Sequence, residues 1–165
     1  MSDAIKQVLQ KIKTENLDMV DVKFVDLHGI WQHFSIPATQ LTEDVFEDGL
    51  GFDGSSIRGF QEINESDMLL MPDPTTVFTD PFSSKTLSII CTIKDPVTKE
   101  KYSRDPRHIA EKAAEHLKKS DVGDISYWGP EAEFFIFDSV RYSQNEYSSF
   151  HAIDSEEGIW NSGRE

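Results

Sequence analysis

Strict alternation of apolar and polar residues constrains the fold of this chain more than any other feature. Every second position from Leu87 to Ile93 is apolar, and the same alternation runs over residues 20–24 and 30–36. A period of two is typical of β-strands with one buried face. The sequence Asp-Leu-His-Gly at 26–29 favours a turn, so the two earlier runs predict a β-hairpin. The fold must therefore provide a sheet with an apolar face.

Helical patterns occur on both sides of these strands. Apolar residues recur at helical spacing over residues 3–15, directly after the N-cap candidate Ser2. A short helix over residues 41–48 is expected to end at Gly49, a residue typical of helix C-termini. Asp105 followed by Pro106 predicts the start of a third helix, which extends to about residue 120.

Two more apolar runs are assigned to strands, and together the elements indicate an α+β fold. The first run covers residues 68–71, and the second is a strand-like run from Ile125 to Val140. No sustained period follows, and the last residues, 159–165, are expected to form part of a loop. The polar stretch 94–104 marks a boundary between a domain at residues 1–104 and the beginning of another at 105–165.

The charge and the cysteine content limit the classes of function. Sixteen basic and 30 acidic residues leave a net charge of −14, which argues against binding nucleic acid or anionic membrane surfaces. Either solubility alone or a preference for cations explains this acidity. A single cysteine, Cys91, excludes an internal disulfide, and no apolar stretch has the length of a signal peptide or membrane span. A cytoplasmic location is the expectation.

A glycine-rich stretch at residues 49–54 has the spacing of a dinucleotide-binding turn, but its context is different. That motif requires a strand before it and a helix after it, whereas here a helical pattern comes first. What remains is a loop that presents Asp53, Ser55 and Ser56 beside backbone that a ligand can approach closely. From spacing alone, the loop is either a binding loop or an ordinary turn.

Glu131 and Glu133 form the second candidate site. In a strand their side chains would share one face, with Cα atoms about 6.6 Å apart, beside Phe135 and Phe137. No Lys or Arg lies between residues 121 and 140 to neutralise them. A poorly solvated carboxylate pair needs a partner, and Mg²⁺ or Mn²⁺ would provide one. The alternative is that both glutamates lie on the solvent face of the strand.

Three longer segments resemble type I glutamine synthetases of the bacterial and cyanobacterial branch. They are VKFVDLHGIWQHFSIP at 22–37, GFDGSSIRGFQEINESDMLLMPD at 51–73 and YWGPEAEFFIFD at 127–138. Their order and spacing are also similar to those of the family. The resemblance implies a β-grasp-like N-terminal domain followed by the beginning of the catalytic α/β domain.

The resemblance also implies a reaction, its cofactors and an assembly. ATP would phosphorylate the γ-carboxylate of L-glutamate, and ammonia would displace the phosphate to give L-glutamine and ADP. Two divalent ions, Mg²⁺ or Mn²⁺, would hold the phosphates at each site. The complete enzyme would be a homododecamer of two hexameric rings, with active sites at subunit interfaces.

Carried over by motif position, the resemblance assigns a role to four residues. Glu131 would ligate the metal on the ATP side, and Glu133 the metal on the glutamate side. Asp53 would bind ammonium and accept its proton, with Ser56 in the same loop, and this loop would reach a neighbouring subunit. Where many relatives have tryptophan, this chain has Phe60, which keeps an aromatic surface without the ring nitrogen.

Length is the main departure from the family pattern. Family members continue well beyond residue 165 and there carry the remaining metal ligands, the ATP pocket and a glutamate-binding arginine. We therefore expect the 165-residue chain to be inactive by itself. The competing hypothesis is a non-catalytic chain that acts as an assembly or binding module with full-length subunits.

Overall fold

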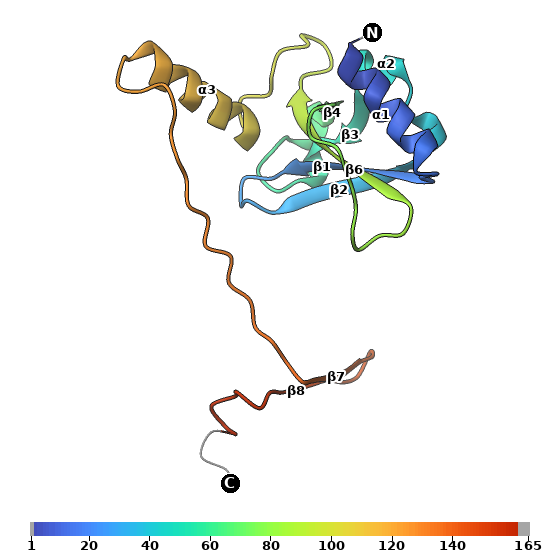
Figure 1. The fold of residues 1–165 in the computed structure, drawn as a ribbon, viewed down its shortest axis with the longest axis vertical. Coiled ribbons are helices and arrows are strands. Elements are labelled where there is room, and N and C mark those ends of the chain that lie inside the picture. The colour runs from blue at the N-terminus through green and yellow to red at the C-terminus, as the bar shows by residue number, and fades with distance from the viewer. Residues whose placement is uncertain (1, 162–165) are drawn as a thin grey trace. The chain divides into compact units, whose positions relative to one another are not determined.

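The computed structural model describes residues 2–161, and the chain divides into two compact units, Met1–Ser126 and Tyr127–Glu165. The first unit combines a six-stranded sheet with three α-helices (Figure 1). The second contains a two-stranded hairpin. The α+β prediction is confirmed. The predicted boundary at residue 104 stays a prediction.

The sheet of the first unit has the strand order β2-β1-β6-β4-β3, and β5 pairs separately with β6. The strands are β1 (Met19–Val25), β2 (Trp31–Pro37), β3 (Leu50–Asp53), β4 (Asp67–Pro72), β5 (Phe78–Thr79) and β6 (Thr86–Lys94). The predicted hairpin of β1 and β2 is confirmed, because the two strands are antiparallel neighbours from Met19↔Pro37 to Val25↔Trp31.

Strand β6 is the centre of the sheet. Its first half pairs in parallel with β1, from Thr86 to Ile90, and its second half pairs antiparallel with β4, from Cys91 to Lys94. A parallel pair requires a crossover connection, and here residues 26–85 provide it. The remaining strands and α2 all lie within that crossover.

Two helices lie on the apolar side of the sheet (Figure 1). Helix α1 (Asp3–Thr14) contributes the buried Val8, and α2 (Glu43–Asp48) contributes partly buried residues. The Ser2 hydroxyl accepts a hydrogen bond from the Ile5 N–H at 3.3 Å, which confirms the predicted N-cap. Helix α2 ends at Gly49, whose φ of 82° is a conformation that favours glycine.

Helix α3 (Pro106–Lys119) follows the sheet and begins as predicted. The Asp105 carboxylate caps it by accepting from the Arg107 N–H at 3.0 Å. The other oxygen of Asp105 accepts from the Ile93 N–H of β6, also at 3.0 Å. One buried carboxylate therefore joins the start of α3 to the central strand.

The alternating residues fill the core. Leu87, Ile89 and Ile93 of β6 are fully buried, as are Val20 and Val22 of β1. All of them belong to one hydrophobic cluster that also contains Phe60 and Met68. The period of two read from the sequence thus marks the buried face correctly.

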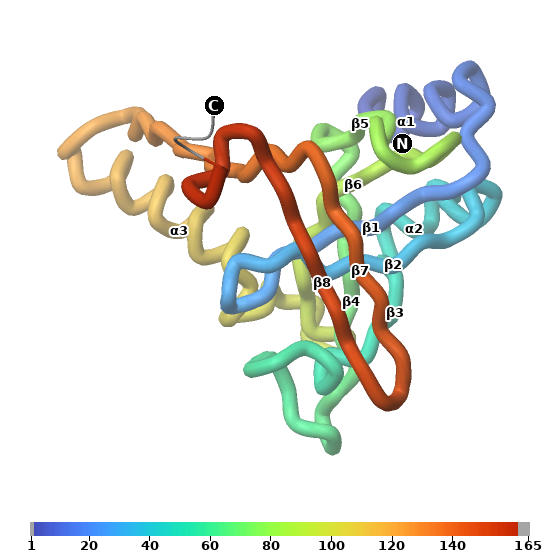
Figure 2. Tube along the Cα trace, turned by 90° about the horizontal axis from the view of Figure 1, so that it is seen from below, coloured from blue at the N-terminus to red at the C-terminus, as the bar shows by residue number. Residues whose placement is uncertain are grey.

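The structure after residue 124 differs from the sequence prediction in two places. Within the described residues, 125–137 carry no regular secondary structure, so the predicted strand at 125–140 is wrong except at its last residues. Strands β7 (Ser139–Gln144) and β8 (Ser149–Asp154) instead form a hairpin where no period was recognised (Figure 2). The final residues of the predicted loop, 162–165, lie outside the described part of the chain.

Over residues 2–161, none of the helices combines the length and the apolar character needed to cross a bilayer.

Shortening a buried side chain of the central strand β6 should destabilise the first unit strongly. Ile89 is fully buried, so Ile89→Ala should lower the free energy of unfolding by about 2–5 kcal/mol. Ile63 is 85% exposed, and the matched control Ile63→Ala should change it by no more than about 0.5 kcal/mol. Urea unfolding followed by circular dichroism measures both variants. Equal losses for the two would contradict the burial assigned to β6.

Candidate functional site

The Asp53 loop begins where edge strand β3 ends. Asp53 pairs with Asp67 of β4, and residues 54–56 then form a short 3₁₀ turn. The Asp53 carboxylate accepts three hydrogen bonds inside this turn. They come from the Ser55 N–H at 2.8 Å, the Ser55 hydroxyl at 2.6 Å and the Ser56 hydroxyl at 3.1 Å. The turn therefore holds the carboxylate in one orientation.

These donors keep Asp53 ionised. The Ser55 hydroxyl, followed by the Ser55 N–H, lowers the pKa of the Asp53 carboxyl below its ordinary value. Asp53 and Ser56 are both exposed, so a ligand can reach them. The structure brings the two predicted residues together, with the Ser56 hydroxyl bonded to Oδ2 of Asp53. Their catalytic role stays a prediction.

Close packing against β4 sets the position of the turn. The Gly54 N–H donates to the Ser66 carbonyl at 2.6 Å. A Cβ atom on Gly54 would lie 2.3 Å from the Sδ atom of Met68, which is itself buried in the core. Only glycine allows this approach without displacing Met68.

Phe60, at the other end of the loop, lies inside the domain. Its ring is 1% exposed and packs 5.4 Å from the Tyr102 ring and 6.3 Å from the Phe24 ring, measured between centroids. The aromatic ring expected at this position therefore packs in the core of the first unit and is not presented to solvent.

Glu131 and Glu133 lie in the second unit, in the stretch without regular structure, and both are exposed. The nearby rings of Phe135 and Phe137 stack with centroids 6.2 Å apart and planes 14° apart. Side chains two positions apart thus share a side in this stretch, although a paired strand was expected. Because Glu131 and Glu133 are exposed, the poorly solvated environment expected for them is not present here. The expected strand is also missing, since strand-favouring residues form a strand only where a neighbouring strand provides hydrogen bonds.

The donor chemistry of this pair suits a hard divalent cation. Carboxylate oxygens are the ligands that Mg²⁺ and Mn²⁺ prefer, and no Lys or Arg competes for them between residues 121 and 140. Across residues 2–161, however, no group of three or more His, Cys, Asp or Glu side chains is arranged to hold a metal. Two glutamates provide part of a coordination shell only.

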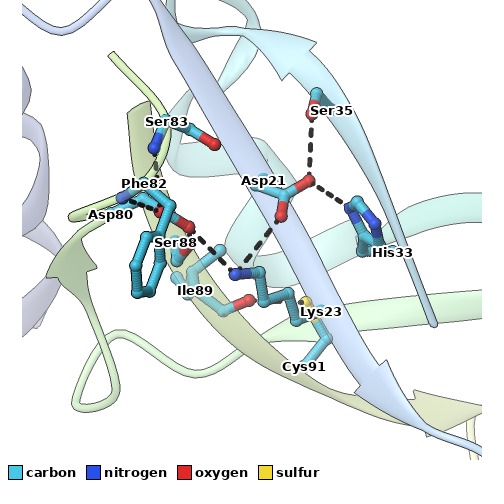
Figure 3. Close-up of polar contacts among 10 residues, drawn as sticks. All are labelled: Asp21, Lys23, His33, Ser35, Asp80, Phe82, Ser83, Ser88, Ile89 and Cys91. Atoms are coloured by element: carbon cyan, nitrogen blue, oxygen red, sulfur yellow. Dashed lines mark hydrogen bonds and ion pairs between the residues drawn. The ribbon is translucent and has the colours of Figure 1, made fainter. Parts of the chain in front are cut away.

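The structure also contains a polar cluster that the sequence analysis missed. Lys23 lies between two aspartates, with its Nζ atom 3.1 Å from Oδ2 of Asp80 and 3.5 Å from Oδ2 of Asp21 (Figure 3). Oδ1 of Asp21 accepts from the Ser35 hydroxyl at 2.9 Å and lies 2.8 Å from Nδ1 of His33. These charges lie on the face of the sheet opposite the core.

This cluster attaches the loop before β6 to the sheet. The Asp80 carboxylate accepts from the Phe82 N–H at 2.9 Å and from the Ser88 hydroxyl at 3.0 Å, in addition to Lys23. The Phe82 N–H, followed by Lys23, lowers the pKa of Asp80 from 3.8 to about 2. The alternation along β1 already placed Asp21 and Lys23 on one face. Asp80 was not predictable, because it comes from an irregular loop.

Family comparisons identify the chain at this point. Residues 16–96 match the model of the glutamine synthetase β-grasp domain, and residues 103–164 match the model of the glutamine synthetase catalytic domain. The chain belongs to the glutamine synthetase family. The Asp53 loop lies in the segment that matches the first domain, and Glu131 and Glu133 lie in the segment that matches the second.

Individual relatives agree with this assignment. A glutamine synthetase of Frankia alni is 57% identical over 160 residues, which is 96% of this chain and 34% of the relative. One from Nostoc sp. is 50% identical over 161 residues, 97% of this chain and 34% of that protein. The chain thus spans about a third of the length of the curated relatives that it matches.

A solved structure supports the same fold. The cryo-EM structure of Plasmodium falciparum glutamine synthetase superimposes with a TM-score of 0.70 at 26% identity, over 95% of this chain and 30% of that one. It confirms the β-grasp domain followed by the beginning of the catalytic domain.

The Asp80 cluster should make the free energy of unfolding of the first unit depend on pH in the acidic range. Folding lowers the pKa of Asp80 from 3.8 to about 2, so its contribution is complete above pH 3.8 and is lost as the pH falls through about 2. Asp80→Asn should make the loss of stability over this interval shallower. Denaturant titrations at a series of pH values measure this, with the exposed Asp124→Asn as control. An unchanged acid profile in Asp80→Asn would contradict the assignment.

Proposed function

We propose that this chain supplies the N-terminal third of a glutamine synthetase subunit. The activity is the ATP-dependent ligation of ammonia to L-glutamate through γ-glutamyl phosphate, giving L-glutamine, ADP and phosphate. One observation carries the proposal: a single chain contains, in the family order, the β-grasp domain with its Asp53 loop and the start of the catalytic domain with Glu131 and Glu133.

The geometry of the loop supports Asp53 as the ammonium ligand. An ionised carboxylate has about four acceptor positions. Ser55 uses both positions on Oδ1, and the Ser56 hydroxyl uses one on Oδ2. Because Asp53 is exposed, an N–H group of a cation can also reach Oδ2, and the negative charge favours that cation. The carboxylate can then accept a proton from bound ammonium, while Ser55 and Ser56 keep it oriented.

Glu131 and Glu133 are proposed as ligands of two divalent ions, Mg²⁺ or Mn²⁺, on the ATP side and the glutamate side respectively. When bound, such ions hold phosphate groups and screen the charge that develops during phosphoryl transfer. The two exposed carboxylates lie in one extended stretch, so they can approach neighbouring ions. The rest of each coordination shell must come from other parts of the catalytic domain.

The proposed assembly is a homo-oligomer, a dodecamer of two hexameric rings, with active sites between subunits. The exposed position of Asp53 and Ser56 at the end of an edge strand supports a loop that reaches another subunit. Small-molecule substrates, namely glutamate, ammonium and ATP, are the only ligands proposed besides the metals.

A non-catalytic module that joins full-length subunits is the second candidate. The second unit favours it, because large side chains including Phe134, Tyr142 and Phe150 remain exposed. Exposed large apolar side chains of this kind are available to pack against another subunit. Mixing the chain with a full-length relative separates the two candidates: incorporation of the chain without any gain of activity favours the module.

The main test is a chimera. By itself, the 165-residue chain should form no glutamine, because it lacks most of each coordination shell. The chain should restore activity when it replaces the matched 160-residue stretch of the Frankia alni relative. Coupled measurement of ADP and glutamine formation checks the isolated chain and the chimera, and the intact relative is the control. Glutamine formation by the isolated chain, or an inactive but correctly assembled chimera, would contradict the proposal.

The metal assignment has a separate test. In the chimera, Glu131→Ala and Glu133→Ala should each weaken Mn²⁺ binding by about tenfold or more, since each removes one charged oxygen ligand. Titration calorimetry with Mn²⁺ measures this without requiring turnover. Glu146→Ala in the neighbouring hairpin is the matched control. If the two variants bind Mn²⁺ as the unmodified chimera does, these glutamates are not ligands.

A further inference from the structure

Three hydrogen bonds converge on the C-terminal end of the Asp53 loop. The Tyr102 hydroxyl donates to the Phe60 carbonyl at 2.6 Å. Nη1 of Arg104 donates to the same carbonyl at 2.7 Å and to the Gly59 carbonyl at 2.9 Å. Both donor side chains come from residues 102–104, more than forty positions along the chain, directly before helix α3. The end of the loop is therefore fixed by residues distant in the sequence, and we call these contacts of Tyr102 and Arg104 the anchor.

Both acceptor positions of the Phe60 carbonyl are used. A carbonyl oxygen has two lone pairs, and here Tyr102 takes one and Arg104 the other. The Phe60 ring is fully enclosed and meets the edge of the Tyr102 ring, so water cannot easily replace the buried Tyr102 hydroxyl. Arg104 is exposed, and its charged guanidinium donates from the solvent side. Gly59 adopts a φ of 85°, and a Cβ atom there would lie 2.9 Å from Leu27. The backbone at this end of the loop has little freedom.

Successive turns connect this anchor to Asp53. The Phe60 N–H donates to the Ile57 carbonyl at 3.0 Å, and the Ile57 N–H donates to the Gly54 carbonyl at 3.1 Å. The two turns share Ile57, and the first turn contains the serines that hold the Asp53 carboxylate. A shift of the backbone at Phe60 would therefore move the turn that orients Asp53.

The donor segment is itself fixed to the sheet. The Tyr102 N–H donates to the Ile93 carbonyl of β6 at 2.9 Å, and the Asp105 carboxylate accepts from the Ile93 N–H. Asp105 also caps helix α3. The segment that precedes α3 thus binds the central strand on one side and the Asp53 loop on the other.

We infer that Tyr102 and Arg104 are positioning residues for Asp53. Neither is proposed to touch substrate; together they hold the far end of the loop so that the Asp53 carboxylate is presented at a fixed place. This inference rests on the proposed function of Asp53, and it goes beyond the site residues assigned above because it adds the segment before α3.

The first test measures the loop directly in the 165-residue chain. Arg104→Met removes one charged group and its two hydrogen bonds, and Tyr102→Phe removes only a hydroxyl while keeping the ring. Hydrogen exchange of the Ile57 and Phe60 amides should become about tenfold faster in Arg104→Met, because the turns open locally. Exchange of the Ile89 amide should not change.

Two further variants give the controls for this measurement. Arg104→Lys keeps a cationic donor and should restore part of the protection. Lys118→Met, an equivalent change at an exposed position of α3, should have no effect on the loop. Unchanged exchange of the Ile57 and Phe60 amides in both Arg104→Met and Tyr102→Phe would overturn the inference.

The second test measures the consequence for substrate in the chimera. Arg104→Met should raise KM for ammonium by about tenfold and leave KM for glutamate unchanged, since only the ammonium ligand is displaced. Tyr102→Phe should act in the same direction with a smaller effect. Arg104→Lys should again lie between the unmodified chimera and Arg104→Met.

Asp53→Asn distinguishes the failure of this inference from that of the proposed function. If Asp53→Asn raises KM for ammonium but the anchor variants do not, Asp53 keeps its role and the positioning role is overturned. If Asp53→Asn itself leaves KM for ammonium unchanged, the proposed role of Asp53 fails, and the positioning role fails with it. In that second case, the hydrogen exchange result still shows whether residues 102–104 anchor the loop.

Discussion

The structure of the first unit depends on the two-sided pairing of β6. Hydrogen bonds along one strand connect the β1–β2 hairpin on one side with the β3–β4 pair on the other, so neither pair would belong to a common sheet without it. The apolar side chains of β6 form the middle of the core, and its Ile93 backbone also holds the segment that precedes α3. Sheet, core and the start of helix α3 thus meet at one strand.

The two faces of this sheet have opposite chemistry. One face is apolar and covered by helices, whereas the other holds the lysine between two aspartates (Figure 3). The half-buried Lys23 is tolerated there because two carboxylates neutralise it and hydroxyl groups donate to those carboxylates. This arrangement attaches an irregular loop to the sheet without adding apolar surface. The Asp53 loop is attached to the domain in another way: side chains distant in the sequence donate hydrogen bonds to its backbone carbonyls.

Local signals in the sequence predicted much of this fold. The alternation at Leu87–Ile93 identified the buried face, and Ser2 and Asp105 identified two helix starts, because capping depends on neighbouring residues. Long-range contacts were not accessible in this way. Nothing near Tyr102 or Arg104 indicates that their donors meet the Phe60 carbonyl.

After residue 124, the sequence patterns predicted a strand that is missing and did not predict a hairpin that is present. Residues 125–137 have strand-favouring composition but no strand in the described chain, whereas β7 and β8 form a hairpin without a recognisable period. A strand is defined by its partner, and a hairpin that is exposed on both faces leaves no alternating signal. The Asp53 turn was predicted as a polar loop. Its sequence did not indicate which N–H and hydroxyl groups donate to the Asp53 carboxylate.

The β7–β8 hairpin also has a consequence for how such a chain behaves during synthesis. Each of its two strands is paired on one side only within the described residues, and exposed aromatic rings surround it. Unpaired edges next to apolar surface are templates for aggregation. The sheet domain leaves the ribosome first, and all residues of its core cluster lie between Val8 and Tyr102. The hairpin that follows exposes its edges until other protein surface covers them, so aggregation during synthesis would begin at this later segment.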